Sequence, residues 1–279
     1  MALKNLLLSI DTDRAAPARY DLAIQLAQVH EARLTGLFVR QMVISQGLPG
    51  GAGVGLNEQF RQAVAAQNAE LENAERAAID SFTEPARAAG IAFDHHIEDG
   101  VGAGSAVPYL VQYARTADLV ILGKAESNGR NIAHDVVFGG GVPVIVVPPV
   151  EHDGIGQRVA IAWNGSREAA RAVKDALPIL ERAASVTILC VNQLGPGQNA
   201  QPGEDLARAL RSHGIDAAVD NVVRKGQSVG DAIVSRLSDI GADLLVMGAW
   251  GHSRLREFVL GGVTKRVLEQ SAVPVLMSH

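Results

Sequence analysis

The sequence predicts an α/β fold in which parallel strands alternate with helices. Short apolar runs, such as residues 5–10 and 118–122, alternate along the chain with segments of helical periodicity. Of the 279 residues, 47% are hydrophobic but only 4% are aromatic, which favours small aliphatic helices packed on a parallel sheet. We therefore expect a doubly wound, Rossmann-like arrangement with helices on both faces of the sheet.

The same order of elements occurs twice. The segment DLVILG at residues 118–123 returns as DLLVMG at residues 243–248. A stretch rich in proline and glycine, residues 148–154, separates the two copies and has the composition of a linker. This duplication predicts two tandem domains, residues 1–150 and 151–279, related by a pseudo-twofold axis.

Each copy is expected to contain five strands. In the first copy the strands are expected at residues 5–10, 33–39, 91–97, 118–122 and 142–147, and helices at 16–29, 57–89 and 105–115, with a short helix before the last strand. Leu22, Leu26 and Val29 fall on one side of the first helix. Pro85 is expected to bend or interrupt the long helix, and the Gly-rich residues 41–56 are expected to form a loop.

The second copy repeats this order after the linker. Strands are expected at residues 158–163, 185–191, 215–223, 243–247 and 273–277, and helices at 166–180, 204–211, 228–240 and 263–270. Ser166 has the residue type and position of a helix N-cap.

Composition excludes several classes of function. A net charge of −5 and the lack of a basic stripe argue against a general binder of nucleic acid or anionic membranes. The single cysteine, Cys190, lies in an apolar run and is expected to be a buried thiol, and no apolar segment at the start of the chain is long enough for a secretory signal, so we expect a cytoplasmic protein. No spacing of His, Cys or carboxylates is typical of a metal site, and none is predicted.

Four glycines near the end of the second copy predict a phosphate-binding loop. Gly248 ends an apolar strand, Gly251 follows it, and Gly261 and Gly262 come directly before the helical residues 263–270. A helix N-terminus offers unpaired backbone N–H groups, and glycine lets an anion approach them because it has no Cβ. The alternative is that these glycines only form turns and a close contact between helix and sheet.

The spacing of these glycines resembles the nucleotide motif G-x2-G-x9-G-(Ser/Thr) of the universal stress protein family, with Gly262 in place of the hydroxyl residue. The resemblance covers essentially the whole chain and implies tandem domains of the adenine-nucleotide alpha-hydrolase-like type. It implies a cytoplasmic stress-response protein that binds ATP. AMP or ADP as the ligand, and Mg²⁺ bound with the nucleotide, remain open alternatives. In such proteins the last strands of the two units meet, here residues 142–147 and 273–277, as an intramolecular pseudo-dimer; a homodimer is left open.

We assign the binding residues to the second copy. They are Asn164, Val191, Gly248, Gly251, His252, Arg254, Gly261, Gly262, Val263 and Thr264. The resemblance implies that Asn164 and the backbone of Val191 face the base, while His252 and Arg254 have the charge to neutralise phosphates or, alternatively, to be solvated loop residues. Thr264 is the candidate for a replacement hydroxyl.

The first copy is expected to have lost this site. Glu126 stands where the second copy has Gly251, and a carboxylate repels phosphate. Gly139, Gly140 and Gly141 lie directly before residues 142–147, with no room for a helix between them. We therefore expect the first copy to serve as a partner domain.

Three alternatives for function remain open. The first is a signalling or scaffold module that binds no nucleotide, and the second is a slow ATPase. No general base is evident near the glycines, which predicts little or no catalysis. A serine hydrolase would use Ser228, which lies in a G-x-S-x-G pattern and is followed by Asp243 and His252. Ser228 followed by Asp231 is, however, also a helix-capping pattern.

Overall fold

The computed structural model describes residues 2–13, 15–41, 58–100, 106–124, 132–191, 202–224, 226–249 and 262–279. The strands in these residues are β1 (Asn5–Ile10), β2 (Arg33–Gln41), β3 (Phe93–Gly100), β4 (Leu119–Gly123), β5 (Val144–Val147), β6 (Arg158–Ala162), β7 (Ser185–Val191), β8 (Ala217–Val222), β9 (Leu244–Gly248) and β10 (Val275–Ser278). The helices are α1 (Ala16–His30), α2 (Glu58–Ala88), α3 (Val107–Ala114), α4 (Ile132–Gly140), α5 (Arg167–Leu180), α6 (Pro202–Arg211), α7 (Val229–Asp239) and α8 (Gly262–Gln270).

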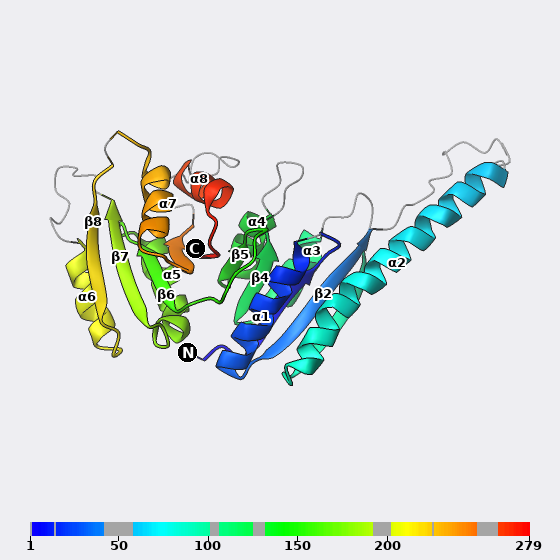
Figure 1. The fold of residues 1–279 in the computed structure, drawn as a ribbon, viewed down its shortest axis with the longest axis horizontal. Helices are drawn as coiled ribbons and strands as arrows, with labels where there is room; N and C mark the ends of the chain where they lie inside the picture. The colour runs from blue at the N-terminus through cyan, green and yellow to red at the C-terminus, as the bar shows by residue number, and fades with distance from the viewer. Residues whose placement is uncertain are drawn as a thin grey trace.

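The strands form one sheet in the order β3-β2-β1-β4-β5-β10-β9-β6-β7-β8 (Figure 1). Neighbouring strands are parallel except for β5 and β10, which pair antiparallel with Val146 opposite Val275 and Val144 opposite Met277. We call β1–β5 with α1–α4 the first half and β6–β10 with α5–α8 the second half. The predicted fold, two doubly wound parallel halves whose last strands meet, is confirmed.

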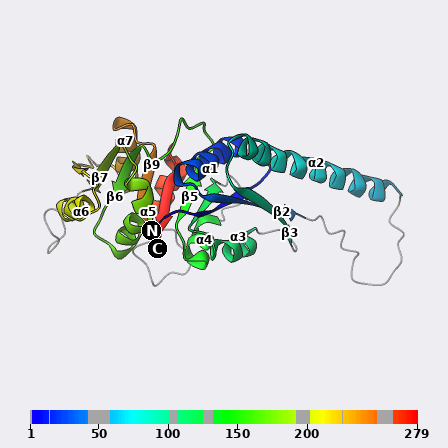
Figure 2. The same cartoon turned by 90° about the horizontal axis from the view of Figure 1, so that it is seen from below.

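Helices cover both faces of the sheet because successive residues of each strand point to opposite sides. In β1, Leu6 and Leu8 belong to the core under α1, α2, α5 and α6. Leu7 belongs to the core under α3, α4, α7 and α8. Figure 2 shows α1 and α2 on one side of the first half's strands and α3 and α4 on the other.

The long helix differs from the prediction in one respect. The expected interruption at Pro85 is wrong, since α2 continues through it from Glu58 to Ala88. Proline removes one backbone donor from a helix. Here Phe82 and Ala86, on either side of Pro85, are both 0% exposed, and their burial holds the chain on the sheet. None of the helices in the described residues, α2 included, is long and apolar enough to cross a membrane.

The glycines of α4 are not the counterparts of Gly261 and Gly262. Gly139 and Gly140 lie in the last turn of α4, whereas Gly262 begins α8. A Cβ on Gly139 would lie 2.9 Å from a Val111 side-chain carbon, so the glycine permits a close contact between α4 and α3. The first half thus has a helix in the same place as α8, and its glycines serve packing.

In each half, an equivalent aspartate ties two neighbouring strands together at their amino ends. Asp118, directly before β4, accepts hydrogen bonds from two backbone nitrogens at the start of β1, both at 2.8 Å. Asp243, directly before β9, accepts bonds at 2.9–3.2 Å from three consecutive backbone nitrogens that lead into β6. A carboxylate satisfies several backbone donors at once, which aligns each pair of strands.

We predict that Asp243→Ala lowers the free energy of unfolding by about 2 kcal/mol, because it removes charge-assisted hydrogen bonds to the start of β6. Urea unfolding followed by circular dichroism measures this. The control is Asp216→Ala, whose side chain is 94% exposed and whose loss should change stability by less than about 0.5 kcal/mol. Equal stabilities of the two variants would contradict the role given to Asp243.

Buried His30 predicts a dependence of stability on pH. Burial, together with the nearby charges of Arg182 and Lys4, lowers the pKa of His30 from its usual 6.5. The unfolded chain therefore takes up a proton below about pH 6.5 that the folded chain resists, so stability falls as the pH drops from 6.5 towards the folded pKa. Burial also lowers the pKa of His152, which adds a loss of the same sign.

Replacing His30 by Gln should therefore reduce the loss of stability between about pH 7.5 and about pH 5.5 without abolishing it. Urea unfolding at the two pH values measures the difference. An unchanged slope in the variant would contradict this origin.

Candidate functional site

The carboxyl ends of β9, β6 and β7 lie at one edge of the second half, because these three strands are parallel neighbours. Gly248 ends β9, Asn164 follows β6 and Val191 ends β7. Helix α8 begins at the same edge, since it must run back to the amino end of β10, which is parallel to β9. We call Asn164, Val191, Gly248 and the start of α8 the candidate site; its role in binding stays a prediction.

Part of the predicted set lies outside the described residues. These positions are Gly251, His252, Arg254 and Gly261. Glu126 of the first half also lies outside them, as do residues 42–56 of the expected loop at 41–56, whose first residue, Gln41, ends β2.

Gly248 has a packing role of its own. A Cβ at this position would overlap the backbone nitrogen of Ala169 and would lie 2.9 Å from its Cα, in the first turn of α5. Only glycine allows α5 to approach the end of β9 this closely. The alternative considered from the sequence, a close contact between helix and sheet, therefore holds for Gly248, and the residue is required by the fold whether or not a ligand binds.

The loop after β6 is held by local hydrogen bonds and is exposed at Asn164. Oδ1 of Asn164 accepts a hydrogen bond from the backbone nitrogen of Ser166 at 3.0 Å. Ser166 in turn caps α5, since its Oγ accepts a bond from the backbone nitrogen of Ala169 at 3.2 Å, as predicted. Asn164 is exposed, and its Nδ2 hydrogens are what it can offer to a ligand.

The start of α8 is exposed at its first residue. Gly262 is exposed, and a Cβ built on it would meet no atom of the described residues within 4 Å. Val263 is half-buried and Thr264 is 4% exposed, so both side chains turn towards the protein. In the described structure, the exposed group at this helix start is therefore the backbone of Gly262, and the hydroxyl of Thr264 lies below the surface.

One side of α8 is fixed to α7 by charge. Nε of Arg266 donates to Oδ1 of Asp231 at 2.6 Å. The other carboxylate oxygen of Asp231 accepts a bond from Oγ of Ser228 at 2.7 Å. These two hydrogen bonds, with that from Ser228 first, lower the pKa of Asp231. Gly230 brings the helices together, since a Cβ there would lie 2.8 Å from Cβ of Arg266.

The geometry does not support a serine hydrolase that uses Ser228 with Asp243. Ser228 is the N-cap of α7, with its Oγ accepting from the backbone nitrogen of Asp231 at 3.1 Å, as the capping alternative predicted. Asp243 lies at the amino end of β9 and is bonded to the backbone before β6, whereas Ser228 follows the carboxyl end of β8. The two side chains therefore lie at opposite ends of parallel strands.

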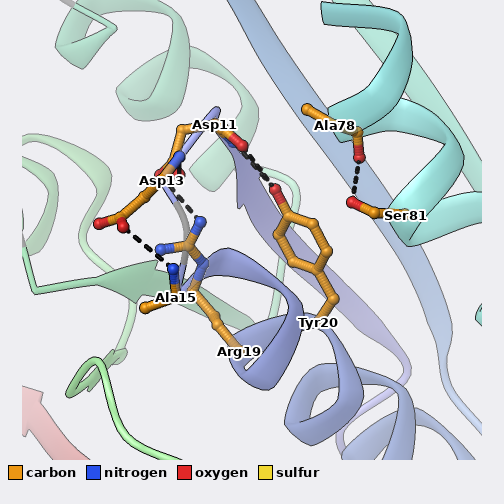
Figure 3. A network of polar contacts seen from close by, with 7 residues as sticks. All are labelled: Asp11, Asp13, Ala15, Arg19, Tyr20, Ala78 and Ser81. Carbon is orange, nitrogen blue, oxygen red and sulfur yellow. Dashed lines mark hydrogen bonds and ion pairs between the residues drawn. The ribbon is translucent and has the colours of Figure 1, made fainter. Parts of the chain in front are cut away.

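The same edge of the first half is filled by an ion pair that the sequence analysis missed. Figure 3 shows Arg19 of α1 reaching Asp11, which directly follows β1. Nη2 of Arg19 donates to Oδ2 of Asp11 at 2.8 Å, and Arg19 is 4% exposed. A signal was present in the sequence, because Arg19 stands on the same helix face as Leu22 and Leu26, three and seven residues on.

The second half is recognised by sequence. Residues 156–279 match the Universal stress protein family. Over 98% of its length the chain is also 26% identical to universal stress protein Slr1230 of Synechocystis sp., of which it covers 99%. Residues 156–279 belong to the universal stress protein family. The recognition made from the glycine spacing is thereby confirmed.

Solved structures with this fold include two that match along nearly the whole chain. A universal stress protein of Archaeoglobus fulgidus has a TM-score of 0.70 at 18% identity, covering 98% of this chain and 96% of that one. The second, from Pseudomonas aeruginosa, is described as a putative universal stress protein and has a TM-score of 0.60 at 14% identity, covering 99% and 93%. At these identities they show a common fold across both halves.

The two described glycines of the candidate site should respond differently to substitution. We predict that Gly248→Ala destabilises the protein by about 1–3 kcal/mol, because the new methyl group overlaps the backbone of α5. Gly262→Ala should leave stability unchanged or slightly higher, because the position is open and alanine favours a helix. Thermal unfolding without added ligand measures both. A stable Gly248→Ala protein would contradict the packing described here.

Proposed function

We propose that this universal stress protein is a cytoplasmic stress-response protein that binds ATP or a related adenine nucleotide at the candidate site of its second half. One observation carries the proposal: the start of α8 at Gly262 is open to solvent, at the edge where β9, β6 and β7 end. Ligands of open α/β sheets bind at the carboxyl ends of the strands, where neighbouring connections diverge.

The proposed binding of phosphate rests on the backbone of α8. The first N–H groups of a helix have no partner within it, and they carry the positive end of the helix dipole. An anion can reach them at Gly262 because the residue is exposed and no side chain of the described residues covers it. In this proposal Gly251 and Gly261 extend the phosphate cradle, and His252 and Arg254 add positive charge.

The proposed base contacts come from the neighbouring strands. Asn164 is exposed on the loop after β6 and offers its Nδ2 donors to a purine edge. Val191 ends β7, the next strand of the sheet, and would contact the base through its backbone. Asn164, Val191 and Gly262 thus give a base end and a phosphate end along the same edge.

We further propose that the units are residues 1–150 and 151–279, and that only the second binds nucleotide. The protein would hold its ligand with little or no hydrolysis. In support, Asp231, which lies on α7 beside α8, is already bonded to Arg266 and Ser228 and does not present a free carboxylate for a metal or a water. Any Mg²⁺ would then accompany the nucleotide through its phosphates.

The test is Gly262→Val, compared with the unaltered protein by isothermal titration with ATP. We expect at least a tenfold loss of affinity, about 1.4 kcal/mol, because the valine side chain covers the N–H groups of α8. The matched control is Gln270→Val, which places the same side chain on an exposed position at the other end of α8. It should bind ATP as the unaltered protein does.

Two results would count against the proposal. If ATP neither binds nor raises the Tm of the unaltered protein, the chain is a scaffold without nucleotide. If Gly262→Val binds ATP undiminished, the phosphates do not lie at the start of α8.

A further inference from the structure

We infer that Arg19 occupies the first half's counterpart of the ligand position and limits the chain to one nucleotide. This inference rests on the function proposed above for the second half. Arg19 would be a specificity-determining residue that acts by exclusion, since it holds Asp11, the residue that corresponds to Asn164.

The register of the sheet makes the two positions comparable. In the first half Leu6 of β1 pairs with Leu119 of β4, and in the second half Val159 of β6 pairs with Leu244 of β9. Counting along the strands from these pairs, Asp11 corresponds to Asn164 and Gly123 to Gly248. Asp11 and Gly123 therefore mark the place in the first half that Asn164 and Gly248 mark in the second.

The guanidinium of Arg19 lies directly on this place. It spans the ends of both strands, because it donates to Asp11 after β1 and lies against Gly123 at the end of β4. A Cβ on Gly123 would overlap Nη1 of Arg19 and would lie 2.9 Å from its Cζ. With Arg19 only 4% exposed, the space between the two strand ends is filled by side-chain atoms.

Each carboxylate oxygen of Asp11 accepts a hydrogen bond from the first half (Figure 3). Its Oδ2 accepts from Arg19, and its Oδ1 accepts from the backbone nitrogen of Asp13 at 3.0 Å. The hydroxyl of Tyr20 donates to the backbone oxygen of Asp11 at 2.9 Å and accepts from its nitrogen at 3.1 Å. Tyr20 is 0% exposed and packs edge-on against Phe82 of α2, so the loop after β1 is anchored to the core.

The second half fills this place differently, with the backbone of Glu168 and Ala169 in place of a guanidinium, and Glu168 is itself buried. There the first turn of α5 itself lies against Gly248, through the backbone of Ala169. The neighbouring positions Ala170 and Ala172 carry only methyl groups, too short to span the strand ends. Asn164 is bonded to Ser166 alone among the hydrogen bonds described here, and it is exposed.

Stability alone does not account for Arg19. Its Nε is buried without a hydrogen-bond partner, and such an atom is costly. Its carboxylate partner, Asp11, is 46% exposed, so much of the charge of Asp11 is screened by water. An apolar residue could fill the same space without an unsatisfied donor. A buried cation at this point is therefore better explained by what it keeps out.

The experiment counts nucleotides per chain by isothermal titration with ATP. The unaltered protein should bind one. Arg19→Ala should bind a second, more weakly than the first because the first half lacks the glycine motif, once the space between Asp11 and Gly123 becomes free. The matched control is Arg33→Ala, which breaks another Arg–Asp pair of the first half, 2.6 Å long but with the arginine 53% exposed, and it should still bind one.

The site gained should be independent of the second half. In the double variant Arg19→Ala, Gly262→Val, the site gained should bind as it does in Arg19→Ala, whereas the site of the second half should be weakened at least tenfold, as in Gly262→Val alone. Circular dichroism and the Tm establish that each variant is folded. If Arg19→Ala does not fold, Arg19→Leu, which keeps the apolar stem but lacks the guanidinium that lies on Gly123, is measured in its place.

Each outcome has one meaning. If the unaltered protein binds no ATP, the proposed function fails. If it binds one and neither Arg19 variant binds a second, the role of Arg19 fails while the proposed function stands. If the unaltered protein already binds two, Arg19 excludes nothing. Hydrogen exchange of the unaltered protein locates the bound nucleotide: ATP should protect residues 262–270 and leave residues 15–20 unchanged.

Discussion

The antiparallel pairing of β5 with β10 is the constraint on which the rest of the structure depends. Both strands are almost fully buried, with Val144, Ile145 and Met277 at 0% exposure. Each would otherwise be the apolar edge of a five-stranded parallel sheet, with a row of unpaired backbone groups. Their pairing joins the halves into one sheet and gives each half a fixed neighbour.

Further contacts cross the same joint. Nζ of Lys124, just after β4, donates to the backbone oxygen of Glu269 in α8 at 2.6 Å. The ring of Phe138 in α4 lies 4.2 Å from that of His279, centre to centre, and Nδ1 of His279 is 3.0 Å from the backbone oxygen of Ala249. The first half therefore supports α8 directly and Ala249, after β9, through His279. This gives the first half a structural role although it lacks the glycine motif.

Much of the fold could be predicted because its signals are local or repeated. Strand β4 was recognisable as an apolar run and again as the copy of β9, and Ser166 and Ser228 cap helices as their residue types indicate. Errors arose where packing overrides local preference. Pro85 does not interrupt α2 because Phe82 and Ala86 are buried beside it, and Val29, expected on the inner side of α1, is 47% exposed.

The candidate site was harder to predict because its residues serve two purposes. Spacing placed Gly248 and Gly262 at the same edge, but it could not show that Gly248 is required by α5 while a Cβ on Gly262 would meet none of the described residues. Arg19 was missed because its significance depends on Gly123, which is distant in sequence and adjacent only after β1 pairs with β4. Contacts of this kind become visible only in three dimensions.

The position of β10 in the sequence has a consequence for folding during synthesis. The first half is complete once β5 has left the ribosome, but the strand that covers β5 follows only after the whole second half. Until then Val144–Val147, an uninterrupted run of aliphatic residues, is an open sheet edge of the kind that recruits other chains. Nascent chains of this architecture therefore pass through an aggregation-prone interval whose length is set by the translation of the second half, and chaperone protection matters most in that interval.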